Sequence, residues 1–263
     1  MFQYDFVRSA FIVGGLLALI IPLIGLTIVL KRLSMIGDAL SHVALSGVAA
    51  GLILGFNPLV GAIVVSLLAS LSIHYIQKNL ASYEELSIAI IMSLGIGLSG
   101  VLLGFVKNPQ NFNAYLFGSV VSINKTDNYL SIILSIIVLA VSLYAYREFF
   151  FIALDEKGAH LSGIPVSKYN IILLTLTAIT VAIASRIVGA LVVSSLIVLP
   201  VALAMRYARS YKMTLVLSML FSLMFMWVGL FVSYWLDLRP GGTIVLTGVL
   251  SYLISLFISA IKR

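Results

Sequence analysis

The 263-residue sequence contains no cysteine. Disulfides, thiolate metal sites and cysteine nucleophiles are therefore excluded from this chain. Charge is also scarce, because Asp, Glu, Lys and Arg make up 10% of the residues, against about 25% in an ordinary soluble domain. No stretch fits the pattern G-x-x-x-x-G-K-[ST]. The chain thus has no P-loop to hold a nucleotide's phosphates, and we do not expect it to be an enzyme.

Hydrophobic residues take the place of the missing charges and make up 62% of the sequence. Several apolar runs reach about 18 residues or more, which is long enough to cross a bilayer. We therefore predict an all-α, polytopic membrane protein with a single transmembrane domain over residues 1–263. We expect nine transmembrane helices, with eight as the alternative count, because only Ser185-Arg186 separates two of the segments. The apolar segments are approximately 10–30, 36–55, 58–77, 86–106, 128–146, 168–185, 187–206, 212–235 and 242–261.

The cations between these segments predict the orientation of the chain. With nine crossings, eleven of the sixteen Lys and Arg residues fall on one side and five on the other. The positive-inside rule places the richer side in the cytoplasm, so the N-terminus is expected outside and the C-terminus inside. Arg186 is expected at a membrane surface, because a cation at mid-depth costs several kcal/mol.

The polar stretch Gly37-Asp38-Ala39-Leu40-Ser41-His42 opens the second apolar segment. Asp38 and His42 are four residues apart, so on a helix they lie on one face, one turn above the other. Carboxylate and imidazole are ligands for zinc, manganese or iron, and a second copy of the chain would raise two ligands to four. The small residues that follow, as far as Gly51, allow close helix packing. The alternative is that Asp38 is an N-cap and His42 is satisfied inside the bundle.

A second polar stretch, residues 155–163, predicts a short cytoplasmic helix that Gly163 and Pro165 terminate. Asp155 and Glu156 begin this helix, where the helix dipole favours anions. A short helix that projects from a membrane bundle suits a cytoplasmic partner, and a solvated connector is the alternative. The residues expected to contact that partner are Asp155, Glu156, Gly158, Ala159, Leu161 and Gly163.

These two stretches resemble the membrane permeases of ATP-binding-cassette (ABC) importers for zinc and manganese. The family's mark is a basic end of the first helix, then G-D-A-[LI]-S-H and a run of small residues. The resemblance extends in order over nearly the whole chain. It includes Tyr115-Leu116-Phe117-Gly118, Asp155-Glu156 with Gly163, Val188-Gly189-Ala190-Leu191-Val192-Val193 ending at Leu199-Pro200, and Gly241-Gly242-Thr243-Ile244-Val245-Leu246.

The resemblance implies a permease bundle like that of vitamin B12 importers, in the plasma (inner) membrane of a bacterium or archaeon. Two copies would form the pore, a separate ATPase would dock on 155–163 as the coupling helix, and an extracytoplasmic protein would deliver the metal. Asp38 and His42 match the family's pathway ligands. The transported Zn²⁺ or Mn²⁺ is then a substrate, and no permanently bound cofactor is implied. The sequence does not choose among zinc, manganese and iron.

Three other functions compete with this interpretation. Permeases for siderophores or vitamin B12 share the helix order but usually have one more N-terminal helix and a loop rich in Asn, Pro and Gly in place of the Asp–His pair. A proton-coupled metal transporter would need a relay of ionisable groups at mid-membrane. An intramembrane hydrolase would need a G-x-S-x-G or H-E-x-x-H pattern, and the sequence contains neither.

Overall fold

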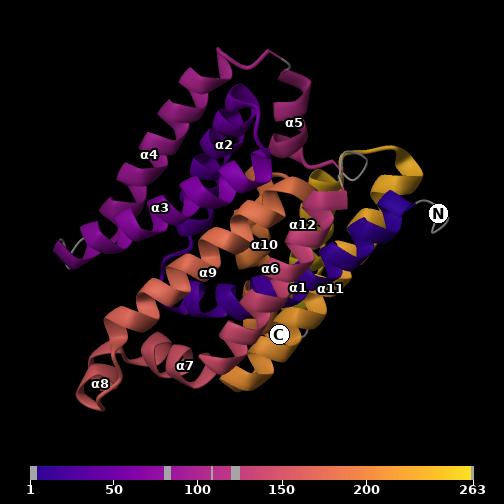
Figure 1. The fold of residues 1–263 in the computed structure, drawn as a ribbon. Helices are drawn as coiled ribbons and strands as arrows, with labels where there is room; N and C mark the ends of the chain where they lie inside the picture. Colours follow the sequence, from indigo (N-terminus) through magenta and orange to yellow (C-terminus); the bar gives the residue numbers. More distant parts are fainter. Residues whose placement is uncertain (1–4, 80–83, 108, 120–124, 262–263) are drawn as a thin grey trace.

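The computed structural model describes residues 5–79, 84–107, 109–119 and 125–261 (Figure 1). Helices joined by short turns make up this part of the chain, and it contains no strand, which confirms the all-α prediction. The helices are α1 (Asp5–Leu30), α2 (Ile36–Leu54), α3 (Pro58–Asn79), α4 (Glu84–Leu103), α5 (Pro109–Phe117), α6 (Lys125–Tyr144), α7 (Tyr146–Leu154), α8 (Glu156–Leu161), α9 (Val166–Ile187), the 3₁₀ turn η1 (Ala190–Val192), α10 (Val193–Met205), α11 (Tyr211–Leu236) and α12 (Pro240–Ile261).

Among the described residues, eight helices are long and apolar enough to cross a membrane. They are α1, α2, α3, α4, α6, α9, α11 and α12, while the apolar helix Ala190–Met205 is shorter. Each of the nine predicted segments thus forms a helix, and the number of crossings and their orientation stay predictions. The boundary expected at Ser185-Arg186 is misplaced, because α9 continues through Ile187 and the chain turns at Gly189, whose φ is 98°.

Two groups of helices pack on either side of α9 (Figure 1). On one side α2 packs against α3 and α4, and on the other α1 packs against α6, α10 and α11. Helix α9 contacts α2 and α3 as well as α1 and α6, so it joins the two groups. The short helices α7 and α8 extend from one end of this bundle, where α8 contacts α7 and α9.

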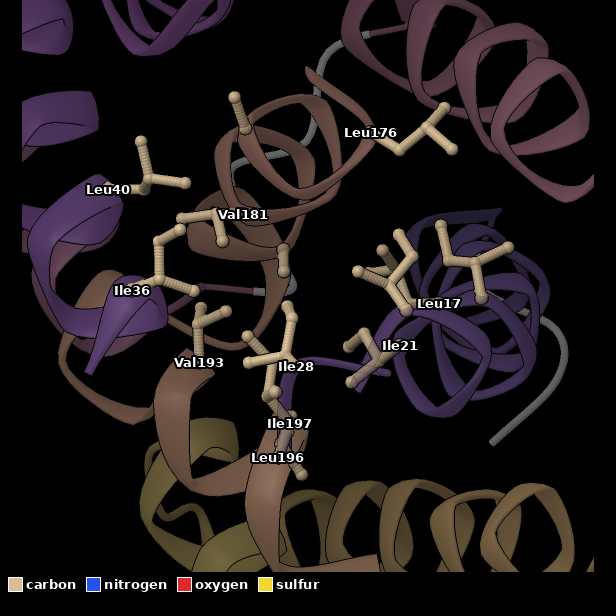
Figure 2. Close-up of a cluster of buried hydrophobic side chains, with 14 of the residues drawn as sticks. Leu17, Ile21, Ile28, Ile36, Leu40, Leu176, Val181, Val193, Leu196 and Ile197 are labelled. Atoms are coloured by element: carbon tan, nitrogen blue, oxygen red, sulfur yellow. The ribbon is translucent and has the colours of Figure 1, made fainter. Parts of the chain in front are cut away.

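Buried aliphatic side chains from four helices meet at the centre of the bundle (Figure 2). In α1, α2 and α9, 72% of the most apolar window is buried, against 22% in α4. The first three are therefore central helices, and α4 is a peripheral one with the apolar surface expected towards lipid. The labelled central residues are Leu17, Ile21 and Ile28 of α1, Ile36 and Leu40 of α2, Leu176 and Val181 of α9, and Val193, Leu196 and Ile197 of α10.

Glycines bring the backbones of α3 and α4 directly against α2. A Cβ on Gly61 would collide with the carbonyl oxygen of Gly47, and a Cβ on Gly47 would collide with that of Gly61. From the other direction, a Cβ on Gly95 of α4 would lie 2.7 Å from the backbone nitrogen of Val43. Small residues at these crossings are what allow transmembrane helices to pack closely, so α2 is held between its neighbours by backbone contact.

A buried ion pair explains how Arg186 is accommodated inside the bundle. Its Nε donates to Oδ2 of Asp127 at 3.2 Å, and the two side chains are 7% and 3% exposed. The other oxygen of Asp127 accepts from Nδ2 of Asn57 at 2.7 Å, and the guanidinium lies 4.6 Å from the ring centroid of Tyr115. Burial raises the pKa of Tyr115 to about 12, against the opposing effect of the Arg186 charge, so the phenol stays neutral. The network joins α9 to α5, α6 and the start of α3, and it allows α9 to continue past Arg186.

The glycine crossing predicts that Gly61→Val strongly destabilises the protein. The added side chain has no space against Gly47, and overpacking of this kind costs about 1–3 kcal/mol or more. Thermal melting of the purified protein in detergent measures the effect. Gly97→Val is the matched control, because a Cβ at Gly97 meets nothing within 4 Å. Equal melting temperatures for the two variants would contradict the crossing.

The buried ion pair predicts that Arg186→Leu lowers the apparent melting temperature by on the order of 10 °C, since it leaves the Asp127 carboxylate buried without its charge partner. The double variant Asp127→Asn/Arg186→Leu should recover much of this loss. Lys107→Gln, at an exposed cation, is the control and should melt like the wild type. A single variant at Arg186 as stable as the wild type would show that the pair is not needed.

Candidate functional site

The first turn of α2 places Asp38 inside the helix. The helix begins at Ile36, its N-cap is Met35, and no side chain caps it. The alternative that Asp38 is an N-cap is therefore wrong. Its carboxylate instead belongs to the first turn, where the positive end of the helix dipole favours a negative charge.

The exposure pattern of α2 singles out the Asp38–His42 face. From Ile36 to Gly51, every residue is buried except Asp38, His42 and Ala50, which are half-buried. Asp38 and His42 are four residues apart and share one face of the helix, whereas Ala50 lies about 120° around the helix from Asp38. Asp38 and His42 therefore form one partly uncovered strip. The rest of the chain encloses this helix and leaves uncovered the strip that carries its two ionisable residues.

Asp38 and His42 make no hydrogen bond or ion pair with any other described residue. Both residues are half-buried, so their side chains remain partly accessible from outside the chain. Within the described ranges, no three His, Asp or Glu residues are close enough together to hold a metal ion. One chain therefore offers one carboxylate and one imidazole at this strip, fewer groups than a four-coordinate site needs.

The predicted short helix is present as α8, after α7. The side chain of Asp155 is its N-cap and accepts from the backbone N–H of Gly158 at 3.0 Å. The chain leaves the helix through Gly163, whose φ of 84° favours glycine. Leu161 is 87% exposed at the helix end, so α8 presents an apolar side chain outside the bundle.

Ala159, which the sequence predicts to contact a partner, is buried instead. It is only 2% exposed and packs with Ile152 and Val166. The apolar side of a short helix must be covered by its own chain if the helix is to stay in place, and Ala159 supplies that contact. Ala159 therefore anchors α8 to α7 and α9, and the exposed Leu161 is the side chain that a partner can reach.

Glu156 forms an ion pair with Lys31 and a hydrogen bond with Asn170, two residues that the sequence alone did not mark as candidates. Its Oε2 lies 3.1 Å from Nζ of Lys31, and its Oε1 accepts from Nδ2 of Asn170 at 2.9 Å. In the sequence Lys31 is one of several cations between apolar segments, and nothing in the local pattern around Asn170 marks it. These contacts join α8 to the end of α1 and the start of α9.

Comparison with known proteins places this geometry in a family. The chain is 32% identical over 261 residues, 99% of its length and 93% of the relative's, to the manganese import system permease protein ScaB of Streptococcus parasanguinis. It is 30% identical over 256 residues, 97% of its length and 98% of the relative's, to the high-affinity zinc uptake system membrane protein ZnuB of Haemophilus influenzae.

A solved structure agrees with these sequence matches. PsaBC from Streptococcus pneumoniae, in complex with a Fab, matches with a TM-score of 0.83 at 32% identity, over 97% of this chain and 92% of that one. The model of the ABC 3 transport family matches residues 3–259. Together with the apolar helices, these matches make the chain an integral membrane protein of the permease type, and it belongs to the ABC 3 transport family.

Proposed function

We propose that this chain is the permease subunit of an ABC importer that moves divalent manganese or zinc into the cytoplasm. The observation that carries the proposal is the uncovered strip of α2, on which Asp38 and His42 are the only ionisable residues. Relatives named as manganese and zinc permeases support the choice of cargo. Membership of an ABC family favours ATP-driven transport over the proton-coupled alternative. The relatives' names favour free ions over siderophores or vitamin B12.

A homodimer would complete the metal pathway. Two copies of the chain, with their strips facing each other, would supply two carboxylates and two imidazoles, enough to replace part of the ion's hydration shell. Binding must be strong enough for the ion to enter and weak enough for it to leave. The donor set suits Mn²⁺, Zn²⁺ and Fe²⁺, so selection among them falls in part to the protein that delivers the ion.

The proposal includes two further partners in the plasma membrane system of a bacterium or archaeon. A separate ATPase would dock on residues 155–163, where Leu161 is exposed at the end of a capped helix. An extracytoplasmic metal-binding protein would dock at the opposite end of the bundle. In this orientation the N-terminus is outside and the C-terminus is in the cytoplasm, so α8 projects on the side where ATP is available.

The double variant Asp38→Ala/His42→Ala should reduce metal uptake roughly tenfold or more, because the ion loses its ligands in the pathway. Uptake of Mn²⁺ and Zn²⁺ into proteoliposomes that contain the assembled importer measures the effect. The control is Ser72→Ala/Ser93→Ala, which removes two exposed hydroxyls that bond only to their own helices. Uptake equal to that of the wild type at equal reconstitution would overturn the site assignment.

Leu161→Asp should weaken binding of the ATPase, because a carboxylate replaces the exposed apolar contact of α8. Co-purification of the ATPase with the tagged permease measures this loss. Leu238→Asp makes the same change at another exposed leucine, outside α8, and should leave the ATPase bound. If both variants retain the ATPase equally, α8 is not its docking site.

A further inference from the structure

We propose that Lys31 is a positioning residue that transmits movement of α8 to the Asp38–His42 strip of α2. This inference rests on the proposed function, in which α8 receives the ATPase and the strip carries the ion. It adds to that function a physical connection inside one chain, between α8, where the ATPase would act, and the strip of α2, where the ion would pass.

Lys31, Glu156 and Asn170 form a closed triangle of polar contacts. Nζ of Lys31 donates to Oδ1 of Asn170 at 2.8 Å and lies 3.1 Å from Oε2 of Glu156. Nδ2 of Asn170 donates to Oε1 of Glu156 at 2.9 Å. Both carboxylate oxygens and both ends of the amide are occupied, so each group fixes the position of the other two.

Burial makes the lysine side of this triangle costly to break. The Lys31 side chain is only 7% exposed, whereas that of Glu156 is 40% exposed. A nearly buried ammonium that loses its carboxylate partner is left as an uncompensated charge. Lys31 is therefore expected to follow Glu156 when α8 moves, while the outer edge of Glu156 stays accessible to a partner's hydrogen-bond donor.

A hydrogen-bonded turn connects Lys31 to the first turn of α2. The backbone N–H of Leu33 donates to Ile28 of α1 at 2.9 Å, and that of Ile36 donates to Leu33 at 3.0 Å. Leu33 and Ile36 are both buried in the central cluster. The segment is thus a packed, hydrogen-bonded corner and not a slack linker, and Asp38 follows it within the same first turn of α2.

Glu156 is the member of the triangle that would move first when the ATPase displaces α8. It is the first residue of α8, directly after the N-cap Asp155, so a rigid displacement of α8 moves its carboxylate as well. Displacement of Glu156 pulls on Lys31 at the end of α1. The packed corner then shifts the start of α2, where Asp38 and His42 lie one turn apart.

The test measures metal transported per ATP hydrolysed by the assembled importer in proteoliposomes, with Mn²⁺ as the probe. Lys31→Met should lower this ratio about fivefold or more, the usual lower range for coupling between two sites. ATPase co-purification and the hydrolysis rate should stay near those of the wild type. Arg32→Gln is the matched control, because it removes the neighbouring exposed cation and should keep the wild-type ratio.

Two further variants separate a specific link from general loss of structure. The double variant Lys31→Met/Glu156→Gln should be no worse than the Lys31 single variant, since both act on one interaction. The exchange Lys31→Glu/Glu156→Lys restores opposite charges and should recover part of the lost ratio. Lys31→Arg should also retain much of it.

The outcomes distinguish this inference from the function on which it rests. A wild-type complex that moves no metal overturns the proposed function itself. A transporting wild type, with Lys31→Met at the same ratio of metal to ATP, overturns only the link. Multiplicative losses in the double variant, or equal losses in hydrolysis and transport, would likewise contradict transmission through Lys31.

Discussion

Backbone-to-backbone packing around α2 is the constraint on which the rest of the structure depends. Gly47 and Gly61 leave no room for a side chain between α2 and α3, and Gly95 brings α4 equally close. Tight packing on these sides buries nearly every residue from Ile36 to Gly51. The strip with Asp38 and His42 is what this enclosure leaves uncovered. In a membrane, where apolar side chains gain little from leaving lipid, such close contacts are the main source of helix association.

Scarcity of charge is the second constraint, and the buried cations Arg186 and Lys31 each have a carboxylate partner. Asp127 with Arg186 closes one network among α3, α5, α6 and α9. Lys31 with Glu156 closes another, where α1, α8 and α9 meet. Each pair satisfies a charge that would be costly alone. The first pair holds helices together, and the second is placed between the proposed ATPase contact and the proposed metal pathway.

The sequence predicted the features that depend on local pattern. Apolar run lengths gave the helices, the i, i+4 spacing put Asp38 and His42 on one face, and the glycine and proline after Leu161 ended α8. The contacts between segments that are distant in the sequence could not be predicted from local pattern. Asp127 and Arg186 are 59 residues apart, and Lys31 and Asn170 are 139 apart. Many loop cations compete for few acids, so only the packing of the helices selects these partners. The burial of Ala159 and the continuation of α9 past Ser185-Arg186 also depend on how the helices pack, which the local sequence does not show.

Zinc X-ray absorption spectroscopy of the purified protein tests the central claim most directly, that Asp38 and His42 hold the transported ion in the proposed homodimer. The chain has no cysteine and three histidines, so His74→Gln/His160→Gln leaves His42 as its only imidazole. With a tag free of histidine, the account predicts imidazole scattering at a zinc–nitrogen distance of about 2.0–2.1 Å, abolished by His42→Gln. Bound zinc without imidazole scattering, or a spectrum unchanged by His42→Gln, would contradict the account.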